Sequence, residues 1–260
     1  LVNIPAFHLW AVNADGEVDE SQLSMRVVVG EAQKNETPVL SAEMQYLDFM
    51  PHWNIPQSIV NNEILEKLER NGNYLSAQNM EIVPSFDKNA TAVAFNKTLL
   101  EDLRKGTLKI RQRPGKGNAL GKVKFIFPNS FNVYLHDTPA GALFKKWRRD
   151  FSHGCVRVED PLALAEFVLH PQAKWNRSAI KKAMIQGNEQ RVYLPKTLPV
   201  TIFYTTAFFD QPNRLKFYPD IYGYDQVLQA ALAKPGEVAD SSLFIQQAAS
   251  EVPEEANLTQ

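Results

Sequence analysis

The order of strand-like and helix-like segments is what most limits the folds open to this chain. Apolar, aromatic and β-branched residues run together or alternate in three early stretches: "AFHLWAV", "MRVVVGE" and "TPVLSAEMQYLDF". Such patterns are typical of strands that bury one face. Comparable stretches return after residue 106, in "LKIRQRP", "KVKFIF" and "FNVYLHD". The chain is therefore predicted to be mainly β with helical additions, an α+β fold, and the segment between these strands must leave and re-enter one β body.

That intervening segment, residues 51–106, has helical spacing in place of alternation. Its clearest helix follows a possible N-cap at Ser58 and places five apolar residues on one face: Ile59, Val60, Ile64, Leu65 and Leu68. Proline or glycine stands at each end, as Pro51 and Gly106, and these residues suit hinges. We therefore interpret the segment as an inserted helical lid, with Trp53 as a packing anchor. The alternative is core scaffolding, in which the apolar face is buried against the sheet.

The rest of the chain is predicted to belong to one domain, residues 1–225, which residues 51–106 interrupt. "EDPLALAEFVL" has acidic residues and a proline where a helix would begin, and "NRSAIKKAMIQG" has the spacing of another helix. "RVYLP" and "PVTIFYTTAFF" have the composition of strands. Residues 226–260 are expected to form a C-terminal helix or flexible tail, because the sequence from Lys234 onward is small, polar and acidic.

Charge and hydropathy exclude some classes of function. The 260 residues carry a formal net charge of −1, so there is no basic excess to suggest a nucleic-acid partner. No run of about 18 apolar residues occurs, so no transmembrane segment is predicted. No signal peptide is visible, and the sequence begins abruptly in an expected strand, so the residues themselves do not predict a location.

The single cysteine stands in "FSHGCVRVED", residues 151–160. A small buried cysteine needs no particular neighbours, whereas a nucleophilic thiol, whose ordinary pKa is about 8.5, needs a base. Two histidines qualify: His153, two residues before Cys155, and His136, at the end of "FNVYLHD". Spacing alone leaves both open. Gly154 lets a carbonyl approach the backbone closely, so the N–H groups around Gly154 and Cys155 are candidates for an oxyanion site.

The stretch from "YLHDTP" to "FSHGCVRVEDPLALAEFVL" resembles the signature of the L,D-transpeptidase family, also called the YkuD or ErfK/YbiS/YcfS/YnhG type. In that signature a histidine is followed, after a spacer, by Ser/Thr-His-Gly-Cys and then by arginine or asparagine. Six residues fill it here: His136, Ser152, His153, Gly154, Cys155 and Arg157. The flanking sequence resembles the larger YcbB-like branch, so the resemblance covers about residues 1–225.

The resemblance implies a domain with a crossed pair of β-sheets that forms cross-links in peptidoglycan. The family's cysteine attacks the bond between the third residue of a stem tetrapeptide and its terminal D-alanine. D-Alanine leaves, and the side-chain amine of a second stem resolves the thioester to a 3→3 cross-link. By this resemblance Cys155 is the nucleophile, His136 the base and the backbone carbonyl of Asp137 the third catalytic element. His153 and Gly154 would flank the oxyanion site.

The same resemblance implies substrate contacts at Arg157, Ser152 and Tyr134, with Arg157 either ordering the loop or meeting a substrate carboxylate. It implies peptidoglycan stem peptides as partners and carbapenem β-lactams as covalent inhibitors. It also implies a place in the periplasm or cell envelope, with roles in cell-wall synthesis and cell shape. Neither a cofactor nor a metal is expected.

Other functions stay open on the residues alone. If water replaced the amine, the protein would be an L,D-carboxypeptidase. His136, His153, Cys155 and Asp137 offer donors for a metal ion, although a second cysteine is lacking. A non-catalytic wall-binding module would have no need for a cysteine with a base at this spacing.

Several further residues have two interpretations. The run "FKKWRRD" lies between His136 and Cys155, and its four cationic side chains are either a solvated face or a means of steering acidic substrates: Lys145, Lys146, Arg148 and Arg149. The remaining histidines are expected to be structural or on the surface: His8, His52 and His170.

Overall fold

The computed structural model describes residues 1–12, 23–211 and 214–233. Most strands belong to one nine-stranded sheet. Its members, in chain order, are β1 (Val2–Asn3), β2 (His8–Trp10), β3 (Ser24–Gly30), β4 (Leu40–Phe49), β8 (Val123–Ile126), β9 (Leu135–His136), β10 (Asp150–Ser152), β11 (Val156–Val158) and β12 (Gln190–Phe203).

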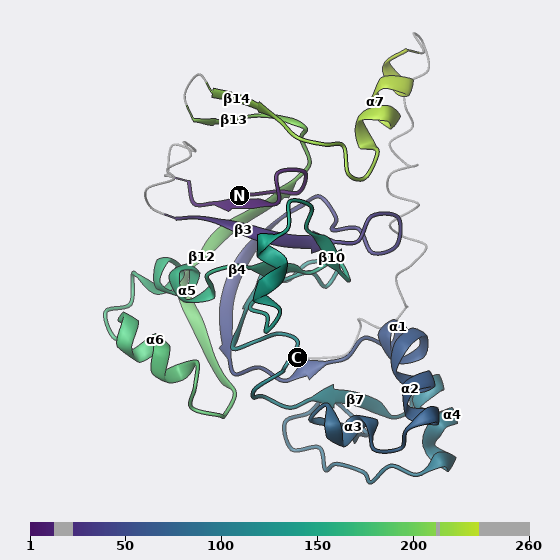
Figure 1. Ribbon diagram of the computed structural model, residues 1–260. Coiled ribbons are helices and arrows are strands. Elements are labelled where there is room, and N and C mark those ends of the chain that lie inside the picture. Colours follow the sequence, from purple (N-terminus) through teal and green to yellow (C-terminus); the bar gives the residue numbers. More distant parts are fainter. Residues whose placement is uncertain (13–22, 212–213, 234–260) are drawn as a thin grey trace.

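The edges of this sheet meet. Its order is β10-β3-β11-β9-β8-β4-β12-β1-β2, and β2 pairs in turn with β3, so the strands from β3 round to β2 form a closed ring. Figure 1 shows β3 running across the direction of β4 and β12, so the two sides of the ring cross as two packed sheets would. The predicted class, mainly β with helical additions, is confirmed.

Period-two alternation explains which side chains fill the ring. Along β3, Met25, Val27 and Val29 are buried in the main core, and along β8 the same holds for Val123 and Phe125. The core is continued by two helices, α5 (Pro161–Leu169) and α6 (Arg177–Ala183), which lie beside β12 and β4 in Figure 1.

The start of α5 follows from its sequence. The Asp160 side chain accepts a hydrogen bond from the N–H of Ala163 at 2.9 Å, and Pro161 occupies the first helical position. The helix predicted in "EDPLALAEFVL" therefore begins where its N-cap and proline require. The two strands predicted in "RVYLP" and "PVTIFYTTAFF" join into the single long strand β12, whose pairing with β4 shifts register between Tyr193 and Leu198.

The interrupting segment is a compact unit with its own small sheet, ordered β5-β7-β6. Its elements are β5 (Trp53–Asn54), α1 (Gln57–Ile59), the π-helix η1 (Val60–Ile64), α2 (Leu65–Arg70), α3 (Tyr74–Ala77), β6 (Met80–Val83), the 3₁₀ helix η2 (Lys97–Leu99), α4 (Leu100–Lys105) and β7 (Lys109–Gln112). In Figure 1 this unit lies at one end of the molecule, away from α5 and α6.

This unit differs from the expected helical segment 51–106 in two respects. It contains strands, and "LKIRQRP", expected to return to the main sheet, forms β7 and pairs with β5 and β6. The apolar face of its helices packs on these strands in a second core that includes Ile59, Leu68 and Ile110. The two ends of this unit lie next to each other, because the side-chain amide of Asn118 donates to the carbonyl of Pro51 at 3.1 Å. We call residues 52–117 the insert.

Beyond the ring, the chain forms the 3₁₀ helix η3 (Gly141–Lys145), the hairpin β13 (Ala207–Gln211) and β14 (Arg214–Phe217), and α7 (Tyr224–Leu232). Helix α7 covers the first part of the predicted C-terminal helix or tail, residues 226–260. The part of that prediction from residue 234 onward lies outside the described residues.

Candidate active site

Strand register brings the two halves of the His-to-Cys motif together. β9 and β11 are parallel neighbours, with Leu135 opposite Val156 and His136 opposite Arg157. Leu135 and Val156 are buried in the main core, so alternation places His136 and Arg157 on the other face of the sheet. Cys155 precedes Val156, whose N–H donates to the carbonyl of Tyr134 at 3.1 Å. The thiol therefore stands at the end of β11 beside the β9 histidine.

The turn that carries the thiol depends on Ser152 and Gly154. The buried Ser152 hydroxyl donates to the carbonyl of Cys155 at 2.5 Å and accepts from the N–H of Gly154 at 3.2 Å. Gly154 has a φ of 105°, which L side chains rarely adopt, so glycine is required here by conformation. Ser152 was expected to contact substrate, but the structure engages its hydroxyl within the turn.

The surroundings of the Cys155 thiol favour its protonated form. The residue is half-buried, and Sγ is 3.9 Å from the carbonyl oxygen of Asn132. Burial raises the pKa of the Cys155 thiol to about 11, while hydrogen bonding to Tyr134 and the positive charge of Arg157 act in the opposite direction. The thiol is therefore protonated at neutral pH and needs a base before it can attack.

His136 has the properties of that base. It is buried, and its Nδ1 lies 2.5 Å from the carbonyl oxygen of Asp137. Because a carbonyl only accepts, Nδ1 carries the proton in this bond and Nε2 is left with a free lone pair. Burial lowers the pKa of His136 to about 3, and the charge of Arg157 adds to this effect. The imidazole is therefore neutral and able to accept a proton at Nε2.

Asp137 is held so that its carbonyl can orient the imidazole. Its carboxylate accepts from the N–H of Lys122 at 2.8 Å and from the N–H of Thr138 at 2.6 Å. Gly121 makes room for it, because a Cβ at that position would lie 2.3 Å from the carboxyl carbon of Asp137. The backbone carbonyl that the resemblance assigned to Asp137 thus contacts the predicted base.

His153 points elsewhere. It is exposed, and its Nε2 lies 2.6 Å from Oε1 of Glu63, a residue of η1 in the insert. Within the described residues neither His136 nor His153 makes a hydrogen bond to the thiol. The two candidate bases therefore differ in their surroundings. His136 is buried and its ring is oriented by a carbonyl, whereas His153 joins the turn that carries Cys155 to the insert.

Two groups near the thiol have no partner in the described part of the chain. The Nε of Arg157 is buried without a hydrogen bond, and burial lowers the pKa of this guanidinium. The N–H of Cys155 also has no acceptor among the hydrogen bonds of the described residues, whereas the N–H of Gly154 is used by Ser152. Of the two backbone donors expected at an oxyanion site, only that of Cys155 is free.

Residues far from the motif hold the turn of residues 152–155, which we call the nucleophile turn after the role proposed for Cys155, and they were not predicted from the sequence. The hydroxyl of Thr37, which is fully buried, donates to the carbonyl of Gly154 at 2.7 Å and accepts from the N–H of Gly30 at 2.8 Å. The hydroxyl of Tyr222 donates to the carbonyl of Gly30 at 2.7 Å and accepts from the N–H of Thr37 at 3.1 Å. We call Gly30, Thr37 and Tyr222 the tether.

Only one member of the tether carried a sequence signal. Gly30 ends the strand-like run "MRVVVGE", and a Cβ there would lie 1.9 Å from the carbonyl oxygen of Asn35. Asn129 was missed as well: its side-chain amide bonds to the backbone at Phe127, Phe131 and Val133 and shapes the turn that presents the Asn132 carbonyl to the thiol.

The basic run before the turn divides into paired and unpaired charges. Arg148 makes two hydrogen bonds to Asp150, at 2.7 and 2.8 Å, and Arg149 bonds to backbone carbonyls, including those of Phe7 and Val27. Lys145 and Lys146 have no acidic partner among the described residues. Among the described residues, the two lysines are therefore the members of this run whose charge has neither a carboxylate nor a carbonyl partner.

The other singled-out residues are structural or on the surface. Trp53 packs on the core of the insert, which confirms it as a packing residue. His8 bonds to Ser24 and His52 to Glu189, while His170 is exposed. The described residues hold no group of three histidine, cysteine, aspartate or glutamate side chains that could bind a metal ion.

Comparison with known proteins agrees with this geometry. The family model described as YkuD, the L,D-transpeptidase catalytic domain, matches residues 1–202. A protein of Haemophilus influenzae, described provisionally as an L,D-transpeptidase, is 31% identical over 230 residues. That alignment covers 88% of this chain and 45% of the relative, so the chain spans less than half of the relative's length. No helix in the described ranges is both long and apolar enough to cross a bilayer.

Proposed function

Since the chain belongs to the YkuD family of L,D-transpeptidase catalytic domains, we propose that it is a cysteine acyltransferase that forms 3→3 cross-links in peptidoglycan. The observation that carries the proposal is the pairing of a protonated thiol at Cys155 with a neutral, buried imidazole at His136 on the adjoining strand. Its Nδ1 is held by the Asp137 carbonyl, which leaves Nε2 as the proton acceptor.

The first half-reaction is acylation. His136 Nε2 takes the proton of the thiol as Sγ attacks the carbonyl carbon of the third stem residue. The N–H of Cys155 donates to the oxyanion that forms. The bond to the terminal D-alanine then breaks, the departing amine receives the proton from His136, and the stem remains as a thioester on Cys155. Arg157, whose buried Nε has no hydrogen-bond partner among the described residues, can bind a carboxylate of the stem or lower the energy of the developing negative charge.

The second half-reaction is transfer. The side-chain amine on the third residue of another stem attacks the thioester carbonyl, and His136 accepts the proton it loses. The amide bond forms, and the thiolate that leaves is reprotonated by His136, which restores the starting state. If water attacks instead, the same steps yield a shortened tripeptide stem, which is the L,D-carboxypeptidase outcome.

We propose that the insert acts as a lid that favours transfer over hydrolysis. It has its own core, and its two ends lie together where Asn118 bonds to Pro51. Its Glu63 reaches His153, two residues before the nucleophile. A lid held over the thioester would exclude water while the amine enters along its edge.

The proposal also covers location and inhibition. A peptidoglycan substrate requires the domain to work in the periplasm or cell envelope. A carbapenem would acylate Cys155, because its β-lactam carbonyl presents the same kind of electrophile to the same thiol.

The decisive experiment incubates the protein with disaccharide-tetrapeptide and follows the products by mass spectrometry. We expect free D-alanine and cross-linked dimers, with both absent from the Cys155→Ala variant. Intact-mass measurement with a carbapenem should add one drug mass to the wild type only. Tripeptide without dimer would assign the carboxypeptidase activity, and no D-alanine release would overturn the proposal.

A further inference from the structure

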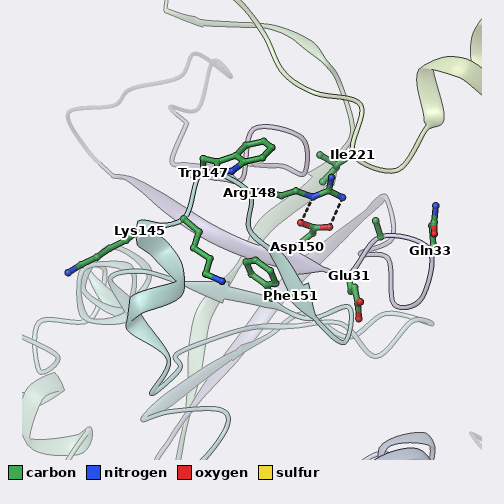
Figure 2. A pocket seen from close by; sticks show the side chains of 10 residues that line it. Glu31, Gln33, Lys145, Trp147, Arg148, Asp150, Phe151 and Ile221 are labelled. Carbon is green, nitrogen blue, oxygen red and sulfur yellow. Dashed lines mark hydrogen bonds and ion pairs between the residues drawn. The ribbon is translucent and has the colours of Figure 1, made fainter.

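A solvent-open groove of about 950 Å³ lies beside the nucleophile turn, and neither half-reaction uses it. Six of its lining residues matter for the argument: Glu31, Lys145, Lys146, Trp147, Phe151 and Ile221. Figure 2 shows Trp147 and Ile221 on one side of the groove, Phe151 and Glu31 on another, and Lys145 at one end. We call it the Trp147 groove.

The groove adjoins the reacting cysteine through β10. Along this strand Asp150 and Ser152 are buried, so Phe151 faces outward into the groove, and Ser152 opens the turn that carries Cys155. Phe151 is four residues before Cys155, so even a fully extended chain would separate their Cα atoms by no more than about 14 Å. A disaccharide with a peptide branch is long enough to span that separation.

The aromatic part of the groove is exposed to an unusual degree. Trp147 has 77% of its surface in solvent, although a tryptophan is generally among the more buried residues. No ring among the described residues stacks on it, whereas Phe151 has the ammonium group of Lys146 4.7 Å from its ring centre. The free indole face is thus a platform for a flat apolar surface. The C–H face of a pyranose is such a surface, and it stacks on indole while its hydroxyl groups stay in water.

The charged part of the groove is positive after internal pairing. Arg148 is neutralised by Asp150, as the dashed lines in Figure 2 mark, and Glu31 pairs with Lys34 at 3.1 Å. Lys145 and Lys146, in contrast, face no carboxylate within the described ranges. A ligand that fits must therefore combine a stacking surface with negative groups.

We propose that the Trp147 groove binds the glycan part of the peptidoglycan substrate, with an amino-sugar ring on Trp147 and stem carboxylates near Lys145 and Lys146. This inference rests on the proposed function, because it takes peptidoglycan as the substrate. It assigns substrate recognition to a surface outside the catalytic turn. A polymer with sugar rings and carboxylated peptide branches supplies both features that the groove requires of a ligand, a surface that stacks on indole and negative groups that pair with the lysines.

The test is a titration of the protein with disaccharide-tripeptide, which has no D-alanine to lose. We expect the indole N–H resonance of Trp147 to shift in the NMR spectrum, while those of Trp10 and Trp175 stay in place. Trp147→Ala should weaken binding at least tenfold. Phe217→Ala is the matched control, because Phe217 is also 77% exposed but lies on β14, and it should bind as the wild type does.

Charge is tested in the same way. Lys145→Glu with Lys146→Glu should weaken binding and remove its salt dependence, while Lys181→Glu with Lys182→Glu, an exposed pair on α6, should not. Stem peptide without sugars is the second probe. If Trp147→Ala weakens both ligands equally, or neither, the glycan assignment is overturned.

The outcomes also separate this inference from the proposed function. D-Alanine release by a wild type whose Trp147 does not respond to disaccharide-tripeptide would overturn the groove alone. A specific Trp147 response in a protein that releases no D-alanine would support the groove and overturn the acyltransferase proposal.

Discussion

At the scale of single residues, the candidate site is defined by two pKa shifts in opposite directions. Burial raises the pKa of Cys155 to about 11 and lowers that of His136 to about 3. Between those values the thiol keeps its proton and the imidazole is without one. The resting pair is therefore neutral, which suits the general-base role proposed for His136, in contrast to a preformed thiolate–imidazolium pair.

This leads to a pH prediction for alkylation of the free protein by iodoacetamide. Only the thiolate reacts, and below a pKa of about 11 its fraction grows tenfold per pH unit. We expect the logarithm of the Cys155 alkylation rate to rise with a slope of one from pH 6 to pH 10. An ion pair would instead give a plateau from weakly acidic pH onward. Mass spectrometry of the modified cysteine measures the rate at each pH. A plateau between pH 6 and pH 10 would contradict the neutral pair.

The two histidines should differ in what their loss does. His136→Ala removes the proton acceptor, so acylation by a carbapenem should slow by roughly 10²–10⁴-fold. His153→Ala removes only an exposed contact to Glu63 and should slow acylation less. Stopped-flow measurement of adduct formation compares them directly. If His153→Ala proves the more damaging change, the two roles must be exchanged.

At the scale of elements, the position of the thiol depends on segments that are distant in sequence. The tether links the end of β3, the loop that follows it and the segment before α7 to the carbonyl of Gly154. Gly154 has no side chain, so its orientation depends on this carbonyl contact together with the hydrogen bond from its N–H to Ser152. The nucleophile turn is therefore held both by hydrogen bonds within the turn, made by Ser152, and by the hydrogen bond from Thr37.

Thr37→Val tests the tether with little change of shape. The hydroxyl is lost, and each of the two buried groups that it served, the Gly30 N–H and the Gly154 carbonyl, costs about 1–3 kcal/mol when left without a partner. We expect a lower thermal midpoint and slower acylation, with the pH profile of alkylation unchanged. Thr37→Ser keeps the hydroxyl and should restore most of the rate. Equal loss in both variants would mean that the methyl group, and not the hydrogen bonds, is what matters.

The local sequence pattern predicted the elements well where one face of the element is buried. It predicted them poorly where the structure depends on which strand pairs with which. β3, β4, β8 and α5 follow from alternation or capping that is visible in the sequence. β7 has the same composition as a main-sheet strand, yet it pairs with β5 and β6, because composition does not specify a partner. The stretch "FNVYLHD" yields only the two-residue strand β9, since Asn129 bends the chain before it.

At the scale of the whole molecule, the sequence predicted the fold class and a candidate pair, Cys155 and His136, but not how the site is held. The motif placed Cys155 and His136 in one short region, and strand register joins them. The role of Thr37 could not be foreseen, since a threonine in a loop has no pattern and its contact to Gly154 spans 117 positions. The same holds for Glu63 and His153, which meet across 90 positions of chain. The closing of the ring between β2 and β3 is likewise a consequence of tertiary pairing alone.

The presence of two separate cores makes the lid proposal testable by deletion. The apolar side chains of the insert pack with one another, and those of the ring pack with α5 and α6. Pro51 and Asn118 are in hydrogen-bond contact, so we choose two glycines to replace residues 52–117. We expect the shortened protein to keep a cooperative thermal transition and to be acylated by a carbapenem. Its products from disaccharide-tetrapeptide should shift from dimer toward tripeptide, because water reaches the thioester.

A point variant in the full chain tests the lid proposal independently of whether the shortened protein folds. Glu63→Gln weakens the contact between the insert and His153 and should shift products in the same direction, though less. Glu66→Gln, a neighbouring exposed residue that pairs with Arg70, should leave the ratio unchanged. Loss of the thermal transition on deletion, with no effect of Glu63→Gln, would assign the insert to scaffolding. A folded shortened enzyme with an unaltered dimer-to-tripeptide ratio would rule out the lid, because the thioester would then be equally protected without it.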